Sequence, residues 1–362
     1  IPVTAEALVI PAGIRVEDAA SHAGFGVPAQ VLADELHART GAEWKVGAKA
    51  AGLTFHRDRA LAPEAFHVAQ SAEGALTLSA SNKLGALFAV GHVLRHLSAC
   101  PGGASYLGDD YTETPAYAVR GHQLGYRATA NSYDAWPPEQ FERYILDLAF
   151  FGTNMIEGIP FHDDRGIVNK PTSRREMNRR ISDICAKYGL QYWVWTPADF
   201  DLNDQTKRTA QLAQYDELFR DSKELTGVFF PGGDPGDNSP DLVLPYLKEV
   251  AARLAKRHPQ ARVWLSLQGF TPPQCQQVYA WVLQERPKWL GGLVAGPSAP
   301  PIQESRRALP AEYGLRDYPD ITHSVRCQFP VPFWDPAFAF TLGRECYNPR
   351  PEFFARVIRD TA

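Results

Sequence analysis

From Ala116 onward the sequence alternates short apolar strands with amphipathic helices, and this alternation limits the possible folds more than any other feature. Strands and helices that alternate at this spacing predict a parallel sheet, and this many units predict a barrel. Seven strands are expected at residues 117–124, 154–157, 191–196, 227–230, 262–267, 292–294 and 314–318. Seven helices are expected at residues 138–151, 173–188, 209–222, 240–258, 273–285, 303–309 and 351–360. We therefore predict an α/β fold, a (β/α)8-type TIM barrel with about seven visible βα units.

An eighth βα unit is missing from this count. An open barrel of seven strands would leave two sheet edges exposed, which natural proteins avoid. The sequence stops before the last unit, or the barrel is incomplete, or the count has missed one unit. All three interpretations stay open.

A smaller α/β domain is expected in residues 1–115, ahead of the barrel domain in residues 116–362. Alternating residues on both sides of Glu73-Gly74 predict a β-hairpin over residues 66–79. Asn82 can cap a helix over residues 83–97, in which apolar side chains recur at helical spacing. The domain is therefore expected to have its own core.

Charge and composition exclude several kinds of partner. A net charge of −4 and a pI of about 6.2 give no reason to expect nucleic acid or an acidic membrane surface. No apolar run reaches the ~20 residues that a membrane-spanning helix needs. The chain begins with Ile1 rather than Met, as a mature form with its leader removed would, and we expect a secreted or periplasmic protein.

The sequence also gives no sign of a metal or other cofactor. None of the five cysteines forms a CxxC pair. His162, Asp163 and Asp164 are ligand types, but side chains adjacent in sequence rarely converge on one ion. We expect neither a metal site nor a cofactor.

The stretch GVFFPGGDPGDN, residues 227–238, is the strongest single indication of a functional site. Its first four residues predict a strand buried on both faces, and the glycines after Pro231 let the backbone turn sharply and leave room for close approach. Asp234 and Asp237 follow at once, at the end of the strand where barrels carry their chemistry. The alternative is a plain turn in which Asp234 caps the next helix.

Other polar side chains recur where the expected strands end. Carboxylates, amides, arginines and tryptophans in these positions suit a ligand that is rich in hydroxyl groups. The further candidates are Tyr126, Arg127, Glu157, Trp195, Gln268, Asp320, His323 and Trp334. Two of them have a structural alternative, because Glu157 could pair with a neighbouring arginine and His323 could be a buried core histidine.

Two short motifs and the domain order resemble the family 20 glycoside hydrolases, the β-N-acetylhexosaminidases. YAVRGHQLGYR, residues 117–127, is similar to their first barrel strand, where an arginine followed by glycine binds sugar hydroxyls, and Arg120 matches that arginine. FFPGGD, residues 229–234, resembles their Gly-Gly-Asp-Glu motif on the fourth strand. SASNKLGALFAVGHVLRHL, residues 79–97, looks like the end of the small α/β domain that precedes the barrel in this family and in the α-glucuronidases.

One departure from the family pattern concerns the mechanism. In the family, the Asp of the motif orients the acetamido group of the substrate and the Glu is the general acid. Asp234 matches the Asp, but Pro235 stands at the Glu position. Either Asp234 or Asp237 is the acid here, or another strand supplies it, or the chemistry differs.

Together these features predict an exo-acting glycoside hydrolase that removes a terminal, N-acetylhexosaminide-like sugar from an oligosaccharide or glycoconjugate. Such hydrolysis usually needs one protonated and one ionised carboxyl, and we expect Asp234 to be one and Asp320 or Glu157 the other. The expected substrate-binding residues are Arg120, Tyr126, Arg127, Trp195, Asp237, Gln268, His323 and Trp334.

Alternatives remain beside this prediction. Two arginines near the first strand would pair with a carboxylate, which favours an acidic-sugar hydrolase of the α-glucuronidase or sialidase kind. Pro235 and the missing eighth strand favour a non-catalytic carbohydrate-binding protein on a decayed glycosidase scaffold. A metal-dependent hydrolase would need three convergent His or carboxylate ligands, which the sequence does not offer.

Overall fold

The computed structural model describes residues 9–11, 13–17, 22–49, 51–124, 136–158, 172–296 and 299–317, together with residues 352, 355, 356, 358 and 359. The chain divides into two compact units. Unit 1 comprises Ile1–His122, Glu142–Met155 and Ile184–Leu190, and unit 2 comprises Gln123–Phe141, Ile156–Asp183 and Gln191–Ala362. Because the two units interleave along the chain, the domain boundary expected at residue 115 stays a prediction.

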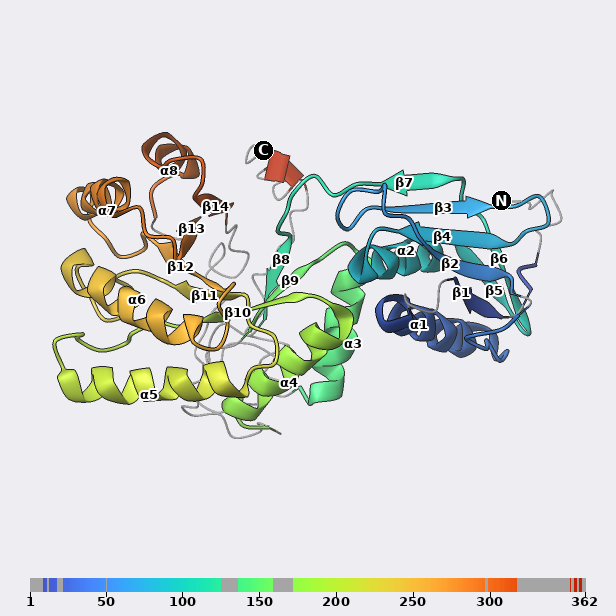
Figure 1. Ribbon diagram of the computed structural model, residues 1–362, viewed down its shortest axis with the longest axis horizontal. Helices are drawn as coiled ribbons and strands as arrows, with labels where there is room; N and C mark the ends of the chain where they lie inside the picture. The colour runs from blue at the N-terminus through green and yellow to red at the C-terminus, as the bar shows by residue number, and fades with distance from the viewer. Residues whose placement is uncertain are drawn as a thin grey trace. The chain divides into compact units, whose positions relative to one another are not determined.

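Unit 1 contains a five-stranded mixed sheet with two helices packed against it (Figure 1). In sheet order the strands are β1 (Ile14–Val16), β2 (Leu53–Arg57), β4 (Leu76–Ala80), β3 (Phe66–Gln70) and β7 (Tyr111–Glu113). β1, β2 and β4 are parallel, whereas β3 is antiparallel to both of its neighbours. The other elements are α1 (His22–Thr40), α2 (Lys83–Arg95) and a hairpin of β5 (Leu97–Cys100) and β6 (Gly103–Tyr106).

Local sequence accounts for the central part of unit 1. The hairpin expected over residues 66–79 is confirmed as β3 and β4, with Gly74 at a φ of 86° in the turn. α2 begins behind Asn82, whose Oδ1 accepts a hydrogen bond from the backbone N–H of Gly85 at 2.9 Å. Every residue of α2 from Leu84 to Leu94 is buried, so this helix forms the centre of the unit 1 core.

The remaining strands form a curled sheet of seven strands in which the pairings from β10 to β14 are all parallel (Figure 1). In sheet order they are β14 (Gly314–Asp317), β13 (Leu290–Ala295), β12 (Arg262–Ser266), β11 (Gly227–Phe230), β10 (Gln191–Trp195), β9 (Met155–Gly158) and β8 (Gly121–Gln123). The helices between them are α3 (Pro138–Phe150), α4 (Arg174–Tyr188), α5 (Gln205–Asp221), α6 (Pro240–Ala255), α7 (Pro272–Glu285) and α8 (Ile302–Ala308).

This order confirms the predicted alternation of strands and helices. All seven expected strands are present, each within a few residues of its expected position. Within the described residues β8 and β14 are the two edges of the sheet, so a closed eight-stranded barrel stays a prediction. Of the helix expected over residues 351–360, only isolated positions are described.

Two tryptophans lie on one face of the curled sheet and require glycine on other strands of the same sheet. The rings of Trp193 on β10 and Trp264 on β12 lie with their centroids 4.8 Å apart. A Cβ on Gly227 would lie 2.5 Å from the Trp193 ring, and a Cβ on Gly314 would lie 2.5 Å from the Trp264 ring. The glycines therefore make the space that the two indoles occupy.

The opposite face of the same sheet packs on the helices. Phe230 of β11 lies against Tyr246 of α6, with ring centroids 6.0 Å apart. Side chains alternate along a strand, so Phe229 points to the other side, the inside of the curled sheet. Among the helices that the structure describes, none is both long enough and apolar enough to cross a membrane.

Candidate active site

The loop after β11 carries Asp234 at the end of the sheet where the strands finish. Asp234 is exposed, and the Gln268 side chain beyond β12 donates a hydrogen bond from Nε2 to Asp234 Oδ2. The backbone N–H of Gly233 donates to the carbonyl of Gln268 at 2.9 Å. Gly232 has a φ of 81°, and a Cβ there would lie 2.5 Å from the carbonyl oxygen of Ser266. Glycine thus allows the sharp turn and the close approach that this stretch predicts.

Asp234 is not the cap of the following helix. α6 begins at Pro240, and its N-cap residue is Ser239. The alternative in which Asp234 caps the next helix is therefore wrong. The Asp234 carboxylate instead accepts a hydrogen bond from beyond the end of the neighbouring strand, β12. Asp237 is exposed at a φ of 50°, and its contact with substrate stays a prediction.

Asn238 joins the Asp234 loop to the loop after β10, and sequence reasoning did not assign it a role. Its side chain is buried, with only 3% exposed. Oδ1 accepts a hydrogen bond from the backbone N–H of Leu202 at 2.8 Å, and Nδ2 donates to the carbonyl of Phe200 at 2.9 Å. The Asn238 amide thereby bonds one backbone donor and one backbone acceptor of the loop after β10. The only sign of this role in the sequence is the place of Asn238 in a turn-rich stretch.

A buried group of polar side chains supports the end of β10 from the helix side. Tyr215 OH donates to the carbonyl of Thr196 at 3.2 Å, and Gln211 Nε2 donates to the carbonyl of Pro197 at 2.8 Å. Tyr246 OH donates to Gln211 Oε1. Burial raises the pKa of Tyr215 well above its usual 10, so its hydroxyl keeps its proton and remains a donor. These bonds fix the backbone that follows Trp195.

Inside the curled sheet, Glu157 of β9 is fully buried in an ion pair with Arg316 of β14. Gln123 of β8 donates from Nε2 to the other carboxylate oxygen of Glu157. The Arg316 guanidinium carbon lies 5.5 Å from the ring centroid of Trp193 and 5.1 Å from that of Phe229. This ion pair with an arginine is the structural alternative that was named for Glu157. A catalytic role for Glu157 stays a prediction.

Arg316 is the residue of this group that sequence reasoning missed. The available signal was a charged residue in the middle of Gly314–Asp317, a stretch expected to be a barrel strand. Trp195 lies at the last position of β10, half-buried and on the same side of the strand as Trp193. Its stacking on a sugar ring stays a prediction.

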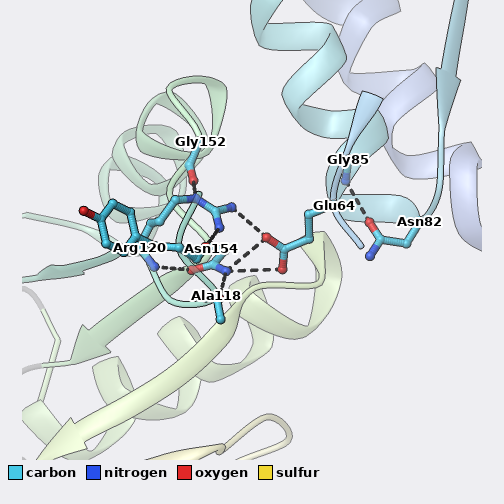
Figure 2. Close-up of polar contacts among 8 residues, drawn as sticks. Glu64, Asn82, Gly85, Ala118, Arg120, Gly152 and Asn154 are labelled. Carbon is cyan, nitrogen blue, oxygen red and sulfur yellow. Dashed lines mark hydrogen bonds and ion pairs between the residues drawn. The ribbon is translucent and has the colours of Figure 1, made fainter. Parts of the chain in front are cut away.

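The guanidinium of Arg120 is bonded within unit 1 (Figure 2). Nη2 donates to Glu64 Oε2 at 2.6 Å, Nε to the carbonyl of Gly152 at 2.7 Å and Nη1 to the carbonyl of Tyr117 at 2.6 Å. Asn154 donates to the same Glu64 oxygen at 3.1 Å and accepts from the backbone N–H of Arg120 at 2.7 Å. These contacts give Arg120 a structural role, and they lend no support to the sugar binding expected of it.

Several expected site residues lie outside the described residues. These are Tyr126, Arg127, Asp320, His323 and Trp334. His162, Asp163 and Asp164, which were not expected to bind a metal, lie there too. In the part of the chain that the structure describes, no group of three or more His, Cys, Asp or Glu side chains is placed to hold a metal ion.

The fold is similar to solved structures of one group of enzymes. No protein-family model matches the sequence, and no curated protein matches it. A mutant β-hexosaminidase of Streptomyces plicatus in complex with its product GlcNAc aligns over 92% of this chain and 80% of its own, with a TM-score of 0.62 and 15% identity. The family 20 β-N-acetylhexosaminidase of Streptomyces coelicolor A3(2) aligns over 90% and 80%, with a TM-score of 0.61 and 15% identity.

A third structure extends the match to nearly the whole chain. The family 20 exo-β-N-acetylglucosaminidase of Vibrio harveyi, in complex with N-acetylglucosamine, aligns over 98% of this chain and 74% of its own, with a TM-score of 0.59 and 11% identity. At this level of identity the similarity shows the fold alone. The chain therefore has a fold related to the family 20 glycoside hydrolases, as its motifs indicated.

Proposed function

We propose that this protein is an exo-acting glycoside hydrolase that removes a terminal N-acetylhexosaminide-like sugar from a glycan. The observation that carries the proposal is Asp234, which follows β11 on a family 20 fold and is held by Gln268. Barrel enzymes keep their reacting groups at this end of the strands. The expected secreted or periplasmic location remains a prediction.

In this proposal Asp234 is one of the two carboxyls that glycoside hydrolysis requires. The second is Glu157, which the structure holds in the ion pair with Arg316, or Asp320, which lies outside the described residues. Pro235 has no acidic group, so the roles that the family assigns to its adjacent Asp and Glu cannot both be assigned to residues 234 and 235. The first carboxyl would assist departure of the leaving group, and the second would stabilise or attack the sugar.

The choice of a neutral N-acetyl sugar over an acidic one follows from Arg120. The acidic-sugar alternative depended on two arginines near the first strand. One of them, Arg120, is bonded to Glu64, so its charge is already balanced by a carboxylate of the protein. Two of the similar solved structures are complexes with N-acetylglucosamine, which supports the same choice.

A non-catalytic carbohydrate-binding protein is the second candidate. Two observations favour this candidate. Proline stands at position 235, where the family has its general acid, and the Glu157 carboxylate is already paired with Arg316. The site would then use Asp234 and Gln268 to bind hydroxyl or amide groups without cleaving a bond.

Hydrolysis of a panel of nitrophenyl glycosides by the wild-type protein separates these functions. We expect N-acetyl-β-glucosaminide or N-acetyl-β-galactosaminide to be cleaved at least about tenfold more efficiently than neutral hexosides. Preferential cleavage of a glucuronide or sialoside would establish the acidic-sugar alternative. Binding of N-acetylglucosamine in calorimetry without turnover of any glycoside would establish the binding protein, and neither binding nor turnover would refute the proposal.

A further inference from the structure

The Asp234 carboxylate is exposed, and among the described residues the Gln268 amide is its one hydrogen-bonding partner. Gln268 Nε2 donates to Oδ2, whereas Oδ1 accepts no bond from a residue in the described part of the chain. An exposed aspartate without such a bond turns between rotamers, but a reacting carboxylate has to lie within about 0.5 Å of its productive position. The orientation of Asp234 therefore depends on Gln268.

The backbone of Gln268 is itself bonded on both sides of its Cα. Its N–H donates to Oγ of Ser266, a buried residue of β12, at 3.1 Å. Its carbonyl accepts from the backbone N–H of Gly233 at 2.9 Å. The side chain of Gln268 thus starts from a fixed position, and the bond to Asp234 sets the torsions that remain.

Glycines on both loops allow the loop after β12 to lie against the loop after β11. A Cβ on Gly232 would lie 2.7 Å from the carbonyl oxygen of Gln268, and a Cβ on Gly269 would lie 2.8 Å from the backbone nitrogen of Asp234. Gly269 has a φ of 78°, which favours glycine. This close approach of the two backbones brings a glutamine side chain within reach of the carboxylate.

We propose that Gln268 is the positioning residue of Asp234 and is not itself a group that binds the sugar. Its amide holds Oδ2 in place and leaves Oδ1 for the substrate. The inference rests on the proposed function, and it replaces the direct substrate contact expected of Gln268 with an action through Asp234. A carboxylate that is already oriented saves the entropy that its ordering would cost in the transition state.

A double-variant cycle tests whether Gln268 acts through Asp234. kcat and KM are measured, on the glycoside that wild type cleaves best, for wild type, Gln268→Met, Asp234→Asn and the double variant. Methionine keeps the length of the glutamine side chain and removes the donor. Gln277→Met is the matched control, because Gln277 of α7 donates to Asp241 of α6 at 2.6 Å. That bond joins the same two βα units, but on their helices.

Gln268→Met should lower kcat about 10- to 100-fold, as expected for the loss of a hydrogen bond to a charged group, and change KM by less than about threefold. In the Asp234→Asn background the same substitution should cost less than about threefold more. Gln277→Met should keep kcat within about twofold of wild type. A direct sugar contact or a purely structural role would instead give equal losses in both backgrounds. That result, or full activity of Gln268→Met, overturns the inference.

A second variant and a second measurement keep the test decisive. If Gln268→Met does not fold, Gln268→Glu replaces it, since an ionised glutamate has the shape of glutamine but cannot donate to a carboxylate. If wild type or Asp234→Asn shows no measurable turnover, dissociation constants for N-acetylglucosamine close the same cycle. Gln268→Met should then weaken binding only where Asp234 is present, and equal binding or equal losses overturn the inference.

The outcomes separate this inference from the proposed function. A loss in Asp234→Asn beside full activity in Gln268→Met overturns the inference alone. Equal kcat/KM in wild type and Asp234→Asn removes Asp234 from the chemistry, and the inference fails with it. A wild type that neither hydrolyses nor binds these sugars overturns the inference and the proposed function alike.

Discussion

His92 shows how burial, more than any other cause, changes the chemistry of a side chain in this protein. It is 6% exposed, and its ring stacks on Tyr111 with centroids 4.2 Å apart. Nε2 lies 3.1 Å from Tyr106 OH. Burial lowers the pKa of His92 from 6.5 to about 4, and the nearby positive charges of His96 and Arg95 act in the same direction. His92 is therefore neutral in the folded protein at pH 7.

This shift predicts that the folded state loses stability as the pH falls from about 6.5 to about 4. In that window the unfolded chain protonates His92 and the folded chain does not, so acid favours unfolding. The difference in unfolding free energy between wild type and His92→Gln should fall by about 2 kcal/mol between pH 7 and pH 4.5. Urea denaturation at a series of pH values measures it, and a difference independent of pH would contradict the account.

At the residue scale, the sequence predicted where a polar side chain lies in the fold better than it predicted which residue that side chain bonds. Asp234 and Gln268 were found because each follows a recognisable strand, and that placement follows from the hydrophobic pattern alone. Arg120 was assigned to sugar binding, yet its guanidinium is bonded to Glu64, a residue far away in the sequence. The pairing of Glu157 with Arg316 likewise joins strands that are distant in the chain. No local pattern specifies which of several arginines reaches a given carboxylate.

At the scale of elements, the candidate site depends on loops that are bonded to one another. Asn238 joins the loop after β11 to the loop after β10, and Gly233 joins it to the end of β12. The strand and helix that flank each loop were predictable from periodicity. The bonds between loops were not, because they satisfy backbone groups whose proximity is set only by the folded sheet.

Asn238→Ala should lower the unfolding free energy by about 2 to 4 kcal/mol, because it leaves the N–H of Leu202 and the carbonyl of Phe200 without their partner. Chemical denaturation measures the loss. Asn203→Ala, an exposed position in the loop after β10, is the control and should stay within about 0.5 kcal/mol of wild type. Equal stability of the two variants would show that the Asn238 amide does not hold the loops together.

The packing of strands on tryptophan gives a second prediction at this scale. Gly227→Ala should destabilise the protein by about 1 to 3 kcal/mol, because the new Cβ meets the Trp193 ring at 2.5 Å. Gly26→Ala, in α1 with nothing within 4 Å, should instead be neutral or stabilising by up to about 1 kcal/mol. Thermal unfolding of both variants and of wild type measures the two changes in stability. A Gly227→Ala variant as stable as Gly26→Ala would contradict the prediction.

At the scale of the whole molecule, alternation of strands and helices was sufficient to predict the seven-stranded curled sheet and the helices between its strands, whereas closure into an eight-stranded barrel stays a prediction. The seven strands lie in the sheet in the same order as along the chain, and known family 20 structures share the fold at 11 to 15% identity. Fold survives at this identity because it depends on the apolar pattern. Function depends on a few side chains such as Asp234, and fold similarity does not establish what they do.

The measurement that bears most directly on the account is therefore the effect of Asp234→Asn on kcat/KM for the glycoside that wild type cleaves best. Asp183→Asn is the control, since Asp183 is 41% exposed on α4 and pairs with Arg179. We predict a loss of about 100-fold or more for Asp234→Asn, at an unchanged melting temperature, and no loss for the control. Equal kcat/KM in wild type and a folded Asp234→Asn variant would contradict the account.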